Sequence, residues 1–295
     1  MSAPSQYPLT RAHGRGRLPG SGIAHWVSDW IADIGARVID WICGLGSLTL
    51  FSLATLRWLF GRWPRKATVM LSFYQIGVRS LWVVALTGTF IGMVLAVQSY
   101  AQFHKLGQET MLGAVINLSL LRELGPVLAA TMLAGRVGSS MAAELGTMRV
   151  TEQIDALDSM GANPIHYLVV PRFLGCLVMI PALTVIADFT GIVGGFWYSV
   201  YQLGIDPSHY LKNATQYVAH FDFFSGVFKS LFFGAAIALI GCHRGFHCEP
   251  GAEGVGRAAT TAFVRSFVVI LFLDLVLSIN LERVYKIFVL KEPGP

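Results

Sequence analysis

Charged side chains are scarce in this chain of 295 residues. Aspartate, glutamate, lysine and arginine make up 13% of it, against about 25% in a typical soluble domain. So few charges cannot cover the surface of a water-soluble globule of this size, and 54% hydrophobic residues argue against intrinsic disorder. We therefore predict an all-α polytopic membrane protein. The net charge of +5 indicates basic cytoplasmic loops rather than a nucleic-acid partner.

Motifs of catalysis and nucleotide binding are also lacking. The glycine-bearing stretches 134–140 and 254–261 lack the lysine with which a P-loop reaches phosphates, so the chain is not expected to hydrolyse ATP by itself. Neither GxSxG nor HExxH occurs. We predict a chain that is not an enzyme and has no cofactor of its own. An intramembrane enzyme is the least favoured alternative, because no nucleophile and base form a recognisable constellation.

Cysteine is rare, with four residues whose spacing does not predict a disulfide framework. One stretch, CHRGFHC, gathers four soft metal ligands: Cys242, His243, His247 and Cys248. Adjacent Cys-His pairs seldom wrap a tetrahedral ion without strain, so a zinc site is the less favoured interpretation of this stretch.

Long apolar runs are present instead. The run 80–103 carries no Asp, Glu, Lys or Arg and reaches about 36 Å as a helix, enough to cross a bilayer. The run 165–203 is too long for one straight span. Pro171 and Pro181 favour a single tilted or broken span, and a two-span hairpin is the alternative. We predict five transmembrane spans, at residues 80–103, 111–136, 165–203, 223–243 and 260–281.

The residues before these spans differ in character. Residues 1–22 are rich in Pro, Gly, Ser and Arg, which predicts a disordered basic cytoplasmic tail, with a transit peptide as the weaker alternative. Over 23–66 apolar residues recur at spacings of three and four opposite charged ones, which predicts interfacial amphipathic helices. An extra short span over 41–56 is the competing interpretation.

The basic residues fix the expected orientation of the transmembrane domain, 67–283. A cluster without acids, from Arg57 to Lys66, is typical of the cytoplasmic side. Five spans then place the C-terminal tail, 284–295, on the opposite side of the membrane.

A polar segment interrupts the apolar pattern after the second span. Charged and apolar residues are interleaved over 139–161, and Asn163-Pro164 marks the end of the predicted helix. The segment is longer than a simple turn between spans requires. Because the chain has no P-loop, we predict that this cytoplasmic helix is a mechanical coupler to an external ATPase.

Two charges lie inside the second span, at Arg122 and Glu123. Charges at this depth cost a few kcal/mol each and face a protein interior or a water-filled cavity. The pair is therefore either a functional site or a structural ion pair between helices, and the sequence favours neither interpretation.

Four stretches resemble the MlaE/YrbE permease family: TGTFIGMVLAVQSY (87–100), NLSLLRELGPVLAA (117–130), AGRVGSSMAAELGTMRVTEQIDAL (134–157) and PRF (171–173). The resemblance implies a multi-pass subunit of an ABC transporter in the bacterial inner membrane, with interfacial helices and five spans. It implies phospholipid transport between inner and outer membranes. It also implies these partners: a second copy of the chain, a cytoplasmic ATPase that binds ATP and Mg, a periplasmic MCE-domain protein and, in some complexes, a STAS-domain subunit.

The resemblance also assigns roles to residues. It makes 139–161 the coupling helix, and the residues expected to contact the ATPase are Glu144, Arg149, Glu152, Gln153 and Asp155. It places Arg122 and Glu123 near a lipid cavity. We expect the acyl chains to lie against apolar residues of the first span, namely Leu86, Phe90, Met93, Val94 and Val97. Gly88 and Gly92 have the spacing that lets two helices approach closely.

Two further functions stay open from the sequence. One is an ABC permease for another hydrophobic substrate or a small polar solute, since DALDSMGANP (155–164) also resembles the EAA loop of importer permeases. The other is a membrane protein with a structural or assembly role. A lipid substrate is favoured because the apolar spans contain few polar groups.

Overall fold

A computed structural model describes residues 24–61, 63–108 and 111–288, and these ranges contain helices, turns and no strand. The predicted tail 1–22 and residues 289–295 of the predicted tail 284–295 lie outside the described residues, whereas residues 284–288 continue the last helix. The chain divides into two compact units, Met1–Ser47 and Leu48–Pro295. Among the described residues, the first unit consists of the N-terminal part of helix α1, Ala24–Gly61.

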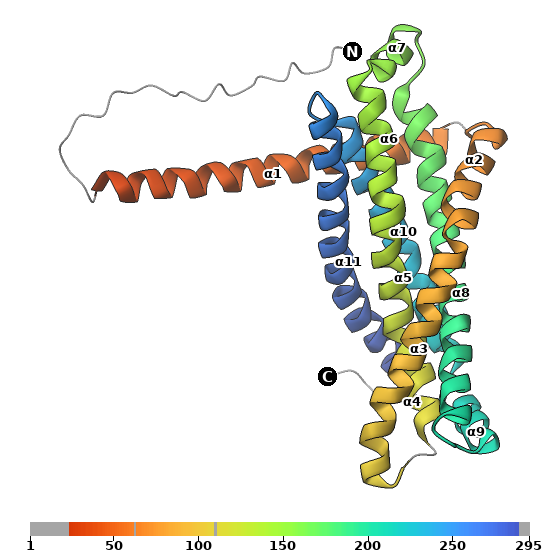
Figure 1. Cartoon of the computed structure of the whole chain (residues 1–295). Coiled ribbons are helices and arrows are strands. Elements are labelled where there is room, and N and C mark those ends of the chain that lie inside the picture. The colour runs from red at the N-terminus through yellow and green to blue at the C-terminus, as the bar shows by residue number, and fades with distance from the viewer. Residues whose placement is uncertain (1–23, 62, 109–110, 289–295) are drawn as a thin grey trace. The chain divides into compact units, whose positions relative to one another are not determined.

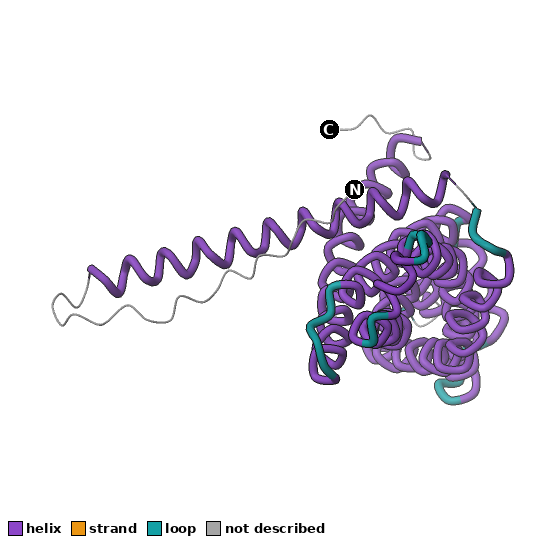
Figure 2. The backbone as a smooth tube through the Cα atoms, turned by 90° about the horizontal axis from the view of Figure 1, so that it is seen from above, coloured by secondary structure: helices purple, strands orange, loops and turns teal. Residues whose placement is uncertain are grey.

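The second unit is a bundle of long helices (Figure 1). Several are interrupted by π-helical turns, labelled η, without leaving the helical path. The first three helical rods comprise these elements: α2 Lys66–Phe73, η1 Tyr74–Val78 and α3 Arg79–Leu106; α4 Leu112–Ser119, η3 Leu120–Leu124, α5 Gly125–Leu133, η4 Ala134–Gly138 and α6 Ser139–Val150; and η5 Ile165–Val169 and α8 Val170–Tyr201. The remaining elements are α7 Gln153–Ser159, α9 Pro207–Tyr217, α10 His220–Phe246 and α11 Ala252–Phe288. Figure 2 shows the bundle nearly end-on, with its helices side by side.

Each of the five predicted spans lies within, or extends at most two residues beyond, a helix long and apolar enough to cross a membrane. These helices are Lys66–Leu106, Leu112–Val150, Ile165–Tyr201, His220–Phe246 and Ala252–Ile287. A sixth helix, Asp33–Gly61, meets the same criteria of length and composition. Residues 24–61 form one continuous helix rather than the several short ones predicted over 23–66, and Gly44 and Gly46 do not break it. The fold class, an all-helical polytopic membrane protein, is confirmed.

The third predicted span is a single helix. Pro181 lies inside α8, and the helix continues past it to Tyr201. The alternative of a two-span hairpin over 165–203 is therefore wrong.

No break in the helix marks the predicted boundary between the second span and the coupling helix. The helix does not stop near residue 136 but continues to Val150, because Met141, Ala142 and Leu145 give it a buried apolar face that packs on α10 and α11. The coupling segment 139–161 is thus two helices, α6 and the short α7. The break falls at Glu152, whose φ of 59° lies in the left-handed region.

The two ends of the bundle carry different short helices. In Figure 1, α7 lies at one end, and α4 and α9, which pack together, lie at the other. Asp206 begins α9 by accepting a hydrogen bond from the Ser208 backbone N–H at 3.1 Å. Hydrogen bonds from Ser208 hold the pKa of Asp206 below its usual value.

Glycines bring α3 and α8 into close contact. A Cβ at Gly88 would lie 2.5 Å from the Ala187 carbonyl oxygen, and a Cβ at Gly194 would lie 2.6 Å from the Thr89 carbonyl oxygen. At Gly92 a Cβ would collide with the backbone of Gly191. The predicted use of Gly88 and Gly92 for close helix approach is confirmed.

Gly92→Ala should therefore destabilise the bundle by about 1–3 kcal/mol, because the added methyl group meets backbone that cannot rotate away. Thermal unfolding in detergent measures the effect. The matched control is Gly256→Ala in α11, where a Cβ meets nothing within 4 Å, and where alanine should be neutral or stabilising. Equal unfolding temperatures for the two variants would contradict the close packing of α3 on α8.

Candidate functional site

Arg122 and Glu123 lie in η3, a π-helical turn in the first half of the second helical rod. Such turns shift the register of side chains and are frequent at functional sites. Pro126 follows in α5 and has no N–H to donate to the carbonyl four residues earlier, which is that of Arg122. This carbonyl accepts a hydrogen bond from Lys229 Nζ at 2.9 Å. Pro126 thus leaves the Arg122 carbonyl available to accept a hydrogen bond from a side chain of α10.

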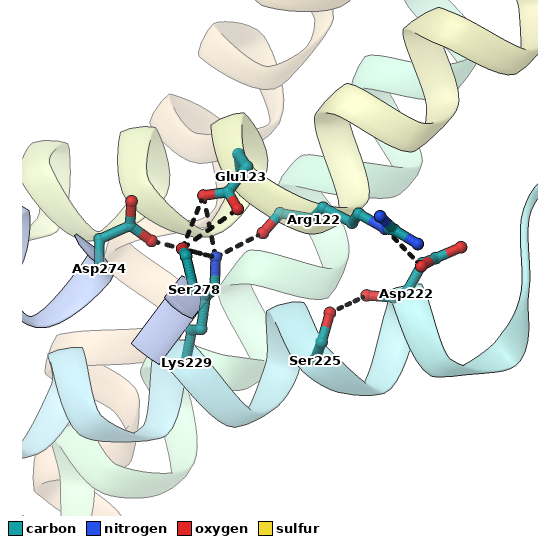
Figure 3. A network of polar contacts seen from close by, with 7 residues as sticks. All are labelled: Arg122, Glu123, Asp222, Ser225, Lys229, Asp274 and Ser278. Carbon is teal, nitrogen blue, oxygen red and sulfur yellow. Dashed lines mark hydrogen bonds and ion pairs between the residues drawn. The ribbon is translucent and has the colours of Figure 1, made fainter. Parts of the chain in front are cut away.

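Lys229 is the centre of a cluster of charges (Figure 3). Its side chain is only 2% exposed. Its ammonium nitrogen lies 2.9 Å from Glu123 Oε2, 3.2 Å from Asp274 Oδ1 of α11, and 2.7 Å from Ser278 Oγ. Ser278 Oγ in turn lies 3.2 Å from both carboxylate oxygens of Glu123. One buried lysine therefore joins the second helical rod to α10 and α11.

Arg122 points away from Lys229 and contacts the beginning of α10. Its Nε lies 2.5 Å from Oδ1 of Asp222, which is fully buried. The second oxygen of Asp222 accepts a hydrogen bond from the Ala219 backbone N–H at 2.9 Å. The Arg122 guanidinium also lies over the Tyr285 ring, 5.5 Å from its centroid. Arg122 thus fixes the start of α10 against η3.

We call Arg122, Glu123, Asp222, Lys229 and Asp274 the charge cluster. When all five are ionised, it holds two cations and three anions. The cluster is buried around Lys229, whereas the Glu123 side chain is 48% exposed. The cluster can therefore hold its shape and still present a carboxylate and a guanidinium to a ligand or to a second chain.

A small pocket opens beside the charge cluster. Its volume is about 110 Å³, below the roughly 300 Å³ of the smallest drug-sized ligand pockets. Its lining residues are Arg122, Glu123, Phe221, Ser225, Lys229, Ser278, Leu281, Glu282 and Tyr285. A two-tailed lipid does not fit this pocket, so a lipid site at the cluster needs a wall from outside the single chain.

The predicted acyl-chain residues lie on α3 and do not line this pocket. Leu86, Phe90, Val94 and Val97 are exposed, and Met93 is half-buried. They lie away from the glycine face that packs on α8. They form an apolar surface, and their contact with acyl chains stays a prediction.

The structure brings four of the five predicted coupling residues together at the turn between α6 and α7. Arg149 Nη1 lies 2.5 Å from Asp155 Oδ1 across this turn, with Glu152 and Gln153 between them. Glu144 lies apart from them, because its carboxylate pairs with Arg172 of α8 at 3.1 Å. Glu144 thus ties α6 to α8, whereas the other four residues form the turn itself. Their contact with an ATPase stays a prediction.

The CHRGFHC stretch is divided by the end of α10. Cys242 and His243 are buried inside the helix, and the rings of His243 and His247 lie 4.3 Å apart. Burial and the neighbouring Glu249 raise the pKa of the Cys248 thiol. Within the described ranges, no group of three or more His, Cys, Asp and Glu side chains is placed to hold a metal ion.

Comparison with known proteins agrees with this architecture of an all-helical, multi-pass membrane protein. Residues 69–280 match the family model of the permease MlaE. A probable ABC transporter permease protein of Rickettsia conorii is 43% identical over 238 residues, which cover 81% of this chain and 92% of that protein. A probable ABC transporter permease protein of Synechocystis is 44% identical over 220 residues, 75% of this chain and 83% of that protein.

A third relative carries a more specific name. The intermembrane phospholipid transport system permease protein MlaE of Haemophilus influenzae is 34% identical over 262 residues, 85% of this chain and 97% of that protein. The chain belongs to the MlaE permease family. It is a non-catalytic membrane subunit of an ABC transporter, and it therefore works with a partner ATPase.

Proposed function

We propose that this chain is the permease of an ABC transporter that moves phospholipids between the inner and outer membranes, and that it lies in the bacterial inner membrane. The observation that carries the proposal is the match over 97% of the Haemophilus influenzae protein, whose name describes an intermembrane phospholipid transport system. The geometry is consistent with a ligand that is polar at one end and apolar elsewhere, because the charge cluster is a polar site within a largely apolar bundle.

The proposed lipid cavity lies between two copies of the chain. The pocket at the charge cluster is too small for a two-tailed lipid, and a second copy would supply the missing wall. The exposed Glu123 and Arg122 would then face the polar end of the lipid, and the apolar surface of α3 would face the acyl chains. Periplasmic transfer would involve an MCE-domain protein, and a STAS-domain subunit is a further partner in this proposal.

The turn between α6 and α7 is the proposed contact with the ATPase, which binds ATP and Mg in place of this chain. Closure of two ATPase subunits would push on α7. Because α6 is continuous with the helix that carries Arg122 and Glu123, a displacement of the turn would reach the charge cluster along one helical rod.

Purification of the full complex in mild detergent tests the proposal, with subunits and bound lipids both identified by mass spectrometry. We expect two copies of the chain, an ATPase and retained phospholipid. A complex that retains a small polar solute and no phospholipid would instead support the alternative substrate class, which the 110 Å³ pocket could hold. A chain that copurifies with no ATPase would contradict the proposal.

Glu123→Gln tests the role of the charge cluster. The substitution keeps the shape of the side chain but removes a charged partner of Lys229, an interaction worth about 1.5–3 kcal/mol. We expect lipid transport to fall about ten-fold or more at wild-type abundance. The matched control is Glu282→Gln, since Glu282 lines the same pocket but pairs with Lys286 on the surface. Normal transport by Glu123→Gln and Glu123→Ala would remove this residue from the mechanism.

A further inference from the structure

A second polar pocket lies at the end of the bundle nearer to α7. It has a volume of about 110 Å³ and lies among the first three helical rods. The charged residues of its lining are Arg79, Arg136, Glu144 and Arg172. Arg122 and Arg136 are 14 positions apart on one helical rod, about 21 Å along its axis. The pocket is therefore separate from the charge cluster.

The charges of this pocket are unbalanced. It contains three arginines and one carboxylate, that of Glu144, which pairs with Arg172 at 3.1 Å. Arg136 donates a hydrogen bond to Ser80 Oγ at 2.5 Å, and Arg79 lies over the Tyr74 ring at 5.9 Å. Within the part of the chain that the structure describes, neither Arg79 nor Arg136 forms an ion pair. Glu144 thus compensates one of the three arginines, and the pocket keeps an excess of two positive charges.

The sequence places the pocket at the expected edge of the hydrocarbon region. Arg79 is the last charged residue before the uncharged stretch 80–103 of α3, so it marks the edge of the hydrocarbon region. Lys66, the last residue of the basic cluster, begins the same helical rod. Excess Lys and Arg is typical of the cytoplasmic side, and basic pockets between transmembrane helices on that side bind anionic head groups.

We propose that the pocket formed by Arg79, Arg136 and Arg172 binds a phosphate group. Guanidinium groups bind phosphate through charge-assisted, often bidentate hydrogen bonds. The phosphate could belong to an anionic phospholipid of the cytoplasmic leaflet or to a free phosphate ion, and the position at the membrane edge favours the lipid. The proposal concerns binding alone, so its test does not depend on transport or on the identity of the transported substrate.

The test uses the purified full-length chain and its Arg79→Gln/Arg136→Gln variant. Thermal unfolding is followed during titration with phosphatidylglycerol, with phosphatidylcholine, or with inorganic phosphate. We expect phosphatidylglycerol to raise the unfolding temperature of the wild type at lower concentration than phosphatidylcholine. Each of the two arginines near the membrane surface contributes about 1 kcal/mol to the binding of an anionic lipid. Because about 1.4 kcal/mol corresponds to a ten-fold change in affinity, the variant should bind phosphatidylglycerol about 30-fold more weakly.

Two further variants keep the result interpretable. Arg257→Gln removes the same kind of charge at the same end of the bundle, where α11 packs on α6. Arg257 does not line the pocket and pairs with Glu253 instead. It should bind phosphatidylglycerol as the wild type does. Arg79→Lys/Arg136→Lys keeps both charges, so it should retain binding of phosphatidylglycerol. This variant provides the test if the double glutamine variant fails to fold.

The outcomes separate the sources of phosphate. Stabilisation by inorganic phosphate that disappears in the glutamine variant supports the pocket with a free anion as its ligand. Stabilisation by phosphatidylglycerol alone, lost in the same variant, supports the pocket as a site for a lipid head group. Equal affinity of wild type and glutamine variant for phosphatidylglycerol would overturn the proposal, as would loss of affinity in Arg257→Gln to the same degree.

Discussion

Lys229→Met is expected to destabilise the bundle by about 3–5 kcal/mol, because it removes the cation from a buried ion pair and leaves two carboxylates behind. Methionine fills a similar volume without a charge, so the loss does not come from a cavity. Glu123 and Asp274 would then repel each other, and the Arg122 carbonyl would lose a hydrogen-bond donor. Transport should be abolished, since the charge cluster loses its shape.

Unfolding in detergent and transport in reconstituted vesicles measure the two effects. The matched control is Lys286→Met. Lys286 is 54% exposed and pairs with Glu282 on the surface, so its loss should change stability by less than about 1 kcal/mol. In the double variant Lys229→Met/Glu123→Gln, part of the stability should return, because one uncompensated carboxylate has been removed. A Lys229→Met chain as stable as the Lys286→Met chain would show that the cluster does not hold the helices together.

The positions of the long helices were predictable because a bilayer offers the backbone no hydrogen-bond partners. An uncharged run such as 80–103 must therefore form a helix. The spacing of Gly88 and Gly92 identified the close approach of α3 to another helix for a similar reason, since only small residues permit it. Which helix it approaches was not predictable, because α8 meets α3 about a hundred positions along the chain, at Ala187 and Gly191.

The ends of the helices were not predictable from polarity. Charged residues over 139–150 mark where the chain leaves the hydrocarbon, but an α-helix continues into water when one face stays buried, as Leu145 does here. The break instead depends on a left-handed residue, Glu152. Glycine or asparagine usually occupies such a position, and a glutamate there gives no signal in the sequence.

Two of the five residues of the charge cluster were visible in the sequence. Arg122 and Glu123 are noticeable because two adjacent charges interrupt an apolar run. Lys229 lies near the start of its apolar run, where a lysine usually reaches the interface. The structure starts α10 at His220, which places Lys229 more than two turns inside the helix. Its pairing with Glu123 and Asp274 joins three helical rods, and such contacts are not encoded in the spacing of one sequence.

The second large effect is expected at the turn between α6 and α7. Asp155→Arg would place a positive charge beside Arg149, its present partner at 2.5 Å. Asp155 is 58% exposed, and such surface pairs contribute at most about 1 kcal/mol to stability. The bundle should therefore remain folded. If α7 docks on the ATPase, transport and ATPase stimulation should nevertheless fall by about ten-fold or more, since a charge reversed in an interface costs several kcal/mol.

The charge-swapped double variant Arg149→Asp/Asp155→Arg separates docking from the shape of the turn. The swap restores an ion pair across Glu152, so a role limited to closing the turn predicts recovery of transport. Docking on the ATPase predicts no recovery, because both charges still face the partner with the wrong sign. Copurification of the ATPase with each variant provides the second measurement. Since Ile154 is the buried residue of α7, the rest of this short helix is free to meet a partner, and we expect the swapped chain to fold normally and to remain uncoupled.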